Sequence, residues 1–206
     1  MDRTFPEGLS GEDIPRNIRY AAALFEALAA YNISDVIDPA SSFVEMSEDA
    51  AALDSLNYPH QTLYYRGGDC DDLSILYCSL LEALGVDTAF VTLPGHIYLA
   101  FEPGVVPAQD GLWNAEGLIE QDGKWWMPVE ITVPDEGFYQ ACRIGARQWN
   151  TALSRSRAGA EGPRLYPMRE SWAVYPSVTV VGDTLPDMPE EAAIVERIGE
   201  LMARLW

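Results

Sequence analysis

A segment that is apolar on nearly every side, residues 70–84, begins with a cysteine and constrains the fold of this chain more than any other. Its sequence, CDDLSILYCSLLEAL, has the length of a helix, and a helix without a polar face is stable only when other elements surround it. Asp69 precedes the segment at the N-cap position, and Gly85 follows it as a C-cap. We therefore expect a buried central helix over about 69–84, around which the other elements pack.

Beyond Gly85 the pattern changes from helical to strand-like. Four short runs are rich in β-branched and aromatic residues, and they span residues 87–93, 96–102, 117–121 and 124–132. Pro94-Gly95 separates the first two runs, and Asp122-Gly123, a strong signal for a hairpin turn, separates the last two. The runs predict a small antiparallel sheet packed on the central helix, so the expected fold class is α+β.

Further helices are expected to flank this core. Apolar residues recur at helical spacing, or follow a capping residue, over 10–31, 47–56, 138–153 and 187–206. Tyr58-Pro59 is predicted to end the second of these helices, because a residue that precedes proline avoids the helical conformation. Residues 154–167 are expected to form a loop, and 172–181 a strand or an extended stretch.

The length and composition are those of one globular domain. The 206 residues are 48% hydrophobic, which predicts a single domain over 1–206 with its core at about 58–132. Residues 187–206 form a C-terminal helical extension in this interpretation. The sequence ends inside that helix without a stop signal, which leaves open a continuation in a longer native protein.

The charge balance excludes some partners. Acidic residues outnumber basic ones by 32 to 13, and a net charge of -19 repels nucleic acid and anionic lipid. The sequence contains no run of about 18 apolar residues, so it predicts no insertion into a membrane. The first twenty residues lack the apolar core of a signal peptide, so we expect a soluble, cytoplasmic protein if the chain is complete. The sequence does not specify an oligomeric state.

Three residues in the core segment have the chemistry of a thiol enzyme. Cys70 stands at a helix N-terminus, where free N–H groups and the helix dipole favour a thiolate. His96 begins a predicted strand and can serve as its base, while Glu130, on a predicted strand of the same sheet, can orient the imidazole. Nucleophile, base and orienting acid are thus expected from three neighbouring elements.

The same region resembles the transglutaminase-like superfamily of papain-fold cysteine enzymes over about residues 58–132. The matching motifs are Gly68-Asp69-Cys70-Asp71-Asp72, Leu80-Leu81-Glu82-Ala83-Leu84-Gly85, Gly95-His96 and Trp126-Met127-Pro128-Val129-Glu130-Ile131-Thr132. The resemblance implies a papain-like core and a Cys70, His96, Glu130 triad. Two features depart from the family: it usually has aspartate at the position of Glu130, and transglutaminases have a tryptophan upstream of the cysteine, whereas the first tryptophan here is Trp113.

Further residues are candidates for the surroundings of the site. Gln61 carries a side-chain amide that can donate to an oxyanion, and it is our candidate to replace the missing tryptophan. Trp126 and Tyr65 are candidates to line a substrate groove. Cys78 and Cys142 are expected to be structural.

We expect neither a metal nor another cofactor. The sequence has no paired ligand spacing of the kind that zinc sites use. Asp69, Asp71 and Asp72 do not form an EF-hand, which also needs a glycine and a glutamate at fixed loop positions. The three aspartates are instead expected to cap the helix that Cys70 begins.

The function predicted from these residues is cysteine-dependent acyl chemistry on an amide, through a thioester. Hydrolysis of a peptide or isopeptide is the first choice, with a peptide or protein as substrate. Transfer of the acyl group to an amine, as in transglutaminases, is the alternative. A second alternative is a binding module that keeps the fold, uses the groove for a partner peptide and performs no catalysis.

Overall fold

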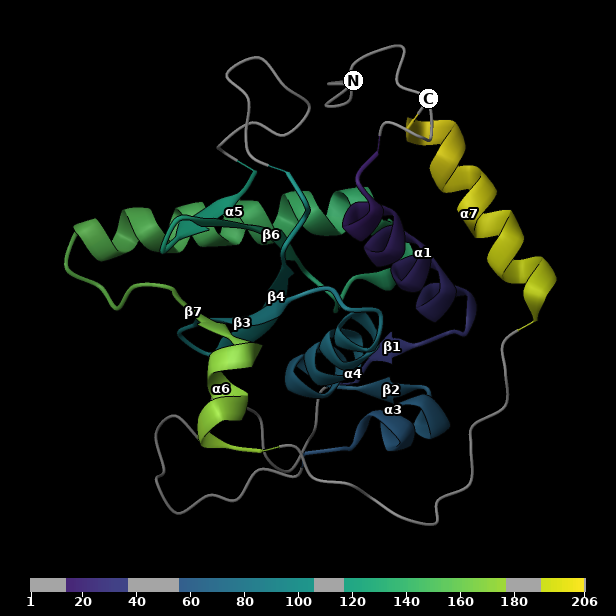
Figure 1. The fold of residues 1–206 in the computed structure, drawn as a ribbon, viewed down its shortest axis with the longest axis horizontal. Coiled ribbons are helices and arrows are strands. Elements are labelled where there is room, and N and C mark those ends of the chain that lie inside the picture. The colour runs from purple at the N-terminus through teal and green to yellow at the C-terminus, as the bar shows by residue number, and fades with distance from the viewer. Residues whose placement is uncertain (1–13, 37–55, 106–116, 177–189, 206) are drawn as a thin grey trace.

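The computed structural model describes residues 14–36, 56–105, 117–176 and 190–205 (Figure 1). Helices and strands follow one another as an α+β chain with an antiparallel sheet. In chain order they are α1 Arg16–Ala30, β1 Ser34–Asp35, α3 Pro59–Tyr65, β2 Gly67–Gly68, α4 Cys70–Ala83, β3 Thr88–Leu93, β4 His96–Phe101, β5 Ile119–Gln121, β6 Lys124–Val129, the 3-10 turn η1 Pro134–Glu136, α5 Phe138–Arg157, β7 Arg164–Pro167, α6 Met168–Val174 and α7 Glu191–Leu205.

Helix α4 is the central helix that its composition predicts. Leu73, Leu76, Tyr77 and Leu81 are completely buried, and they belong to a core cluster shared with α1 and the sheet. The helix ends as predicted, because Gly85 adopts φ +73°, a left-handed conformation that glycine accepts without strain.

The sheet has five antiparallel strands in the order β5-β6-β4-β3-β7. The predicted β5–β6 hairpin is present, and β3 and β4, which Pro94-Gly95 separates, also pair with each other. In the β5–β6 turn Asp122 and Gly123 have φ of +53° and +75°, the positive values that a type I′ hairpin turn requires. Strand β7 pairs with the edge of β3, so the prediction of a loop over 154–167 was wrong for this part.

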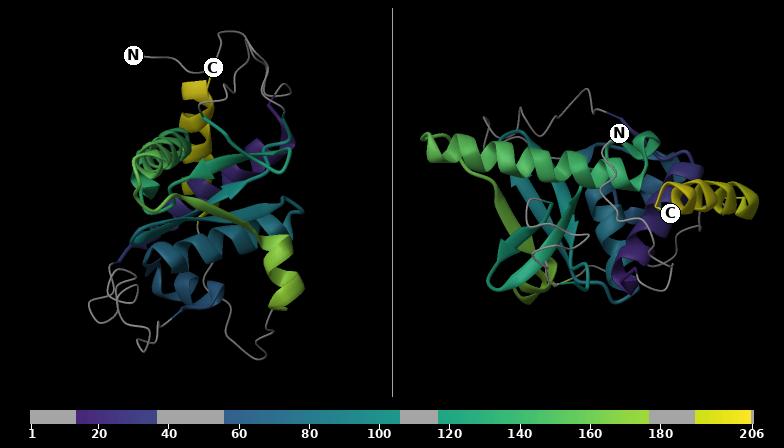
Figure 2. Two further views of the ribbon diagram at one scale, coloured as in Figure 1. Left: turned by 90° about the vertical axis from the view of Figure 1, so that its left-hand side faces the viewer. Right: turned by 90° about the horizontal axis from the view of Figure 1, so that it is seen from above.

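Helices cover the sheet on two sides, with α3 and α4 below it and α5 above it in the left view of Figure 2. The alternation of side chains along the strands explains the layers. Leu99 and Val129 lie in the cluster that contains α4, whereas Tyr98 and Trp126 belong to a second cluster. The hydroxyl of Tyr98 donates to the carbonyl of Gly145 in α5, which places that side chain under α5.

Several flanking elements differ from the predictions. Tyr58-Pro59 starts α3, which was not predicted: proline at the first helical position lacks only an N–H that would have no partner there. Helix α1 begins at Arg16, and α5 extends to Arg157, beyond the predicted end. Residues 172–174 are helical, in α6, and not extended. The predictions for Ser10, for 47–55, for 177–181 and for Asp187 lie outside the described residues.

Helix α7 lies beside α1, as Figure 1 shows. An ion pair joins them: the Arg197 guanidinium lies 3.2 Å from the carboxylate of the buried Glu26. The other oxygen of Glu26 accepts the backbone N–H of Phe138, at the start of α5, at 2.9 Å. Glu26 therefore joins three helices. Within the described part of the chain, every helix is too short or too polar to cross a membrane.

Candidate active site

The site is built around the first residue of α4. Asp69 is the N-cap of this helix and its side chain accepts the backbone N–H of Asp72. Cys70 is the first helical residue and is half-buried, so it remains partly accessible to solvent. The N–H groups of the first turn have no carbonyl partners within the helix and are directed at this region.

The two glycines before Asp69 are required by close packing. A Cβ atom on Gly68 would lie 2.5 Å from the Cβ of Asp72, and one on Gly67 would lie 2.8 Å from Cγ2 of Val36. Real Cβ atoms do not approach other heavy atoms this closely, so Gly68 needs to be glycine, while a side chain at position 67 would displace the exposed Val36. The Gly-Gly pair thus lets the chain pass against its own helix end and against β1 just before Cys70.

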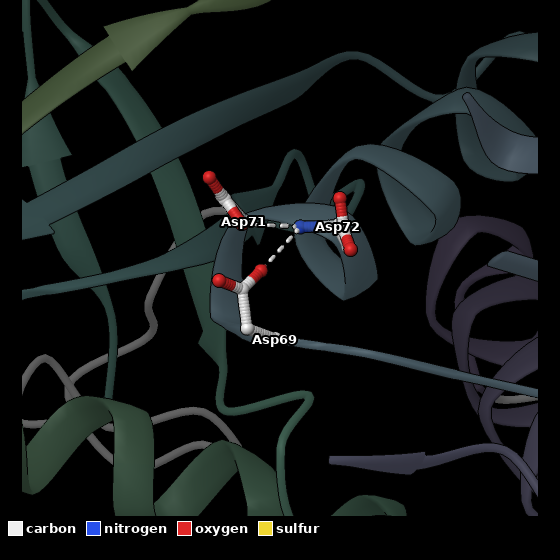
Figure 3. Close-up of side chains that lie close together, drawn as sticks. All are labelled: Asp69, Asp71 and Asp72. Carbon is white, nitrogen blue, oxygen red and sulfur yellow. Dashed lines mark hydrogen bonds between the residues drawn. The ribbon is translucent and has the colours of Figure 1, made fainter. Parts of the chain in front are cut away.

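The three aspartates of the first turn lie together, with ligand oxygens within 4.8 Å of one another (Figure 3). The Asp71 carboxylate accepts the Asp72 N–H at 2.8 Å, and the Asp72 carboxylate accepts both the backbone and the side-chain N–H of Asn57, at 2.7 and 2.6 Å. Burial raises the pKa of Asp72 despite the hydrogen bonds from Asn57. The bonds that Asp69 and Asp71 accept from the Asp72 N–H are the helix-capping role that the sequence predicts for the cluster, whereas the bonds from Asn57 join the segment before α3 to α4.

His96 and Glu130 form the pair that the sequence analysis anticipates. Nε2 of His96 lies 2.7 Å from Oε2 of Glu130. The sheet register explains the contact: Leu99 pairs with Val129, so the next residue, Glu130, falls opposite Tyr98 on the face that also carries His96. Glu130 follows the last residue of β6 and is not inside the strand as predicted.

The carboxylate of Glu130 is buried, and both of its oxygens have hydrogen-bond partners. The residue is 1% exposed, and its second oxygen, Oε1, accepts the hydroxyl of Thr132 at 2.7 Å and its backbone N–H at 3.2 Å. Burial alone would raise the pKa of this acid. The hydrogen bond and charge of His96, with the two bonds from Thr132, outweigh burial and lower the pKa of Glu130. The carboxylate is therefore ionised and held in one orientation.

His96 links this carboxylate to the thiol. Burial opposes protonation of the ring, but a side-chain hydrogen bond with Cys70 and the bond and charge of Glu130 outweigh it and raise the pKa of His96 to about 10. Tyr98 stacks on the imidazole, with ring centroids 5.8 Å apart, and so limits its rotation.

The structure thus brings Cys70, His96 and Glu130 into one connected set. At neutral pH the imidazole is charged, with a carboxylate on one side and a sulfur on the other. An imidazole in this position can stabilise a thiolate, give a proton to a leaving group and take one from water.

The other predicted site residues have different positions. Trp126 is 2% exposed and packs in the second core cluster, and the pocket that it borders with Lys124 and Arg169 lies at the opposite end of β6 from Glu130. Its role in a substrate groove stays a prediction. Trp125, on the opposite face of β6, is the half-buried member of the pair. Tyr65 is 63% exposed at the end of α3, where its ring contacts Tyr64, and its groove role stays a prediction.

Gln61 has a structural task in α3. Its side-chain oxygen accepts the backbone N–H of Tyr58 at 2.8 Å and caps the start of that helix. The sequence analysis did not foresee this bond. The amide nitrogen is a separate group, and its role as an oxyanion donor remains a prediction.

The remaining cysteines lack the surroundings of Cys70. All three thiols are free. Burial raises the pKa of Cys78 to about 12, and burial also raises the pKa of Cys142 far above its usual range. Both cysteines pack with the core, as expected of structural residues.

Sequence reasoning missed one acidic residue at this site. Asp35 lies in β1, which pairs in parallel with β2, and it stands opposite Gly68, two residues before Cys70. No local motif marks it, because the contact joins segments more than thirty residues apart. Only the pairing of β1 with β2 reveals its position.

Comparison with known proteins adds no relative. No family model matches the chain, and neither a curated protein nor a solved structure matches it. The case for a function therefore depends on the geometry of Cys70, His96 and Glu130 and on the motifs that contain them.

Proposed function

We propose that this protein is a cysteine amidase or peptidase, built on a papain-like core of the transglutaminase-like type. One observation carries the proposal: the His96 imidazole lies 2.7 Å from the carboxylate of the buried Glu130, and its interactions with Glu130 and with Cys70, the first residue of α4, raise its pKa to about 10. Structural histidines often bind one carboxylate. A histidine whose charged form is also stabilised by a half-exposed thiol at a helix N-terminus has the connections of a catalytic base.

Acylation uses the charged imidazole. With the proton on His96, the Cys70 sulfur attacks the carbonyl carbon of an amide, and a carbon–sulfur bond forms while the carbonyl oxygen takes the negative charge. His96 then gives its proton to the amide nitrogen, the carbon–nitrogen bond breaks, and an amine leaves. The product is a thioester on Cys70. Glu130 keeps the ring in place and stabilises its charged form.

Hydrolysis reverses the proton transfers. Neutral His96 takes a proton from water, whose oxygen attacks the thioester carbon. The carbon–sulfur bond then breaks, the acid product leaves, and the thiolate–imidazolium pair is restored. The oxygen that gains charge in both steps lies near the first turn of α4, where the backbone N–H of Cys70 is a suitable donor.

The transglutaminase-like assignment is supported by the arrangement of the chain. A buried helix that begins with cysteine, an antiparallel strand that begins with histidine and an acid just beyond the neighbouring strand occur in the expected order. Glutamate at position 130 can replace the family's usual aspartate here, since it reaches Nε2 at 2.7 Å.

The proposal can be tested with a peptide library and a charged-amine competitor. The protein is incubated with a proteome-derived peptide mixture, with and without a large excess of a fluorescent primary amine, and products are identified by mass spectrometry. We expect hydrolysed products that are absent with Cys70→Ser. Alkylation of Cys70 by an iodoacetamide probe, measured in parallel, reports whether the thiol is reactive.

The outcomes separate the alternatives. If amine adducts dominate, acyl transfer replaces hydrolysis. If Cys70 is labelled rapidly but no peptide or isopeptide reacts, a binding module becomes the better description. If Cys70→Ser leaves product formation unchanged, the nucleophile assignment is wrong.

A further inference from the structure

Asp35 is placed beside the proposed nucleophile by backbone pairing. Asp35 stands opposite Gly68 in the parallel β1–β2 ladder, and the N–H of Val36 donates to the Gly68 carbonyl at 2.9 Å. Both residues of β1 are exposed, so the carboxylate of Asp35 remains open to a ligand. The ladder therefore holds an acid at the solvent side of the segment that leads into Cys70.

The position of Asp35 is fixed by the same packing that requires glycine before the nucleophile. A Cβ on Gly67 would approach Cγ2 of Val36 to 2.8 Å and the carbonyl oxygen of Ser34 to 3.3 Å. The residues on both sides of Asp35 thus lie against the Gly-Gly pair. The close packing of Ser34 and Val36 on Gly67 keeps Asp35, which lies between them, next to the segment before Cys70.

The charges around Asp35 are mostly of its own sign. Partial burial raises its pKa, and repulsion from Glu130 and Asp69 raises it further, while attraction to His96 opposes the shift. Within the described residues, no lysine or arginine forms an ion pair with Asp35. Arg66, close in sequence to β2, is directed elsewhere: its guanidinium lies over the ring of Tyr31, 4.6 Å from the centroid.

We infer that Asp35 is a specificity-determining residue that makes the Cys70 site select reactants carrying a positive charge next to the atom under attack. A cationic group bound there would relieve the repulsion among Asp35, Asp69 and Glu130, whereas an anionic group would increase it. The substrate class is then a peptide or protein with a lysine or arginine side chain, or a free amine, adjacent to the reacting carbonyl. This inference rests on the proposed function, because it assumes that Cys70 is the nucleophile.

The test uses three methanethiosulfonate reagents: a cationic trimethylammonium-ethyl and an anionic sulfonato-ethyl derivative, which carry opposite charges on the same ethyl linker, and a small neutral methyl derivative as a measure of general access to the thiol. The thiolate attacks the sulfenyl sulfur, a disulfide forms, and methanesulfinate leaves. Rates at Cys70 are measured by mass spectrometry of the intact chain with Cys78 and Cys142 monitored separately. The ratio of the cationic to the anionic rate reports the potential at the thiol and needs no knowledge of the substrate.

We expect Asp35→Asn to lower this ratio about fivefold, the effect of removing one unit charge at a partly hydrated site. Asp35→Glu should restore the ratio, because it restores the charge. The matched control is Asp122→Asn, which removes the same charge in the β5–β6 turn, at the opposite end of β6 from Glu130. Asparagine tolerates the positive φ of +53° at that position. The control should change the ratio less than about 1.5-fold.

Each outcome decides the inference. An equal ratio in Asp35→Asn and Asp122→Asn overturns it and leaves the proposed function intact. A thiol at position 70 that reacts with none of the three reagents overturns the proposed function and the inference together. A fivefold loss of selectivity in a variant whose melting temperature and neutral-reagent rate match those of the unaltered protein supports the inference, because a merely structural role of Asp35 would change the rates of all three reagents alike.

Discussion

Helix α4 carries two cysteines, eight positions apart, in opposite surroundings. Cys70 is half-buried at the first position of the helix, and its interaction with His96 helps to raise the pKa of that imidazole. Cys78 is 1% exposed in the core, and burial raises its pKa to about 12. The same side chain on the same helix is thus expected to be a nucleophile at one position and an inert apolar group at the other. The difference lies in the helix end and in His96.

The comparison separates two requirements for a reactive thiol. One is an open helix N-terminus, which α4 provides through Gly68 and the N-cap Asp69. The other is a base held in place, which Glu130, Thr132 and Tyr98 provide for His96. Substitutions that remove one requirement at a time can sharpen the comparison, and we order them from the largest expected effect to the smallest.

Gly68→Ala should have the largest effect, because the new methyl group would clash with the first turn of α4. The new Cβ would meet the Asp72 Cβ at 2.5 Å, and Asp72 is fixed by its bonds to Asn57. We expect a loss of about 3 kcal/mol in the free energy of unfolding, as for other overpacked sites, measured by urea denaturation.

A matched substitution controls for the loss of a glycine. Gly199 lies in α7, and a Cβ there would meet no heavy atom within 4 Å. Gly199→Ala should be neutral or stabilise the protein by up to about 1 kcal/mol. If the two variants unfold at the same urea concentration, the close approach at Gly68 does not constrain the helix end.

His96→Ala should make Cys70 behave as an ordinary exposed thiol. A thiol with a pKa of about 8.5 is only about 3% ionised at pH 7, so alkylation by iodoacetamide is expected to slow by up to about 30-fold. His60→Ala is the control, since His60 is the other histidine of the chain and lies in α3. Equal rates in the two variants would show that His96 does not activate the thiol.

Glu130→Gln should reduce the rate of Cys70 alkylation about fivefold, less than loss of the imidazole. Glutamine retains a carbonyl oxygen for Nε2 of His96 but removes the charge that helps to keep the ring protonated. Glu170→Gln removes the same charge from an exposed position in α6 and should leave the rate unchanged. A rate in Glu130→Gln as slow as in His96→Ala would mean that the carboxylate does more than orient and charge the ring.

Cys78→Ser should have the smallest effect on reactivity, with the alkylation rate of Cys70 changed less than about twofold. The substitution places a hydroxyl in a buried position and is expected to cost about 1–2 kcal/mol of stability. Peptide mapping after limited alkylation separates the two quantities. A large fall in Cys70 labelling would indicate that the two positions are coupled through the helix. The difference between the two cysteines would then not be explained by their local surroundings alone.

The sequence predicts those parts of the fold whose signals are local. The all-round apolar pattern and Gly85 predict α4, and Asp122-Gly123 predicts its hairpin. The pairing of His96 with Glu130 was also anticipated, because both residues adjoin strands of one sheet.

The features that the sequence did not predict depend on contacts between distant segments. Pro59 was taken as a helix end because proline stops helices from within, but it also suits the first position of α3. Strand β7 forms because the edge of β3 is available to it. The face on which Trp126 lies follows from the sheet register relative to α5, and Asp35 reaches the site only through the β1–β2 ladder.

The central claim is that Cys70 and His96 exist as a thiolate–imidazolium pair, and the pH dependence of alkylation tests it most directly. The pKa of His96 is raised to about 10, so the ring keeps its proton throughout the neutral range and can stabilise a thiolate beside it. Rates of Cys70 and Cys78 modification by iodoacetamide are measured in the same sample between about pH 6 and pH 8 by quantitative peptide mapping. The account predicts that Cys70 is modified far faster than Cys78 and that its rate changes less than about threefold over this interval. A Cys70 rate that rises about tenfold per pH unit, as for an unpaired thiol, would contradict it.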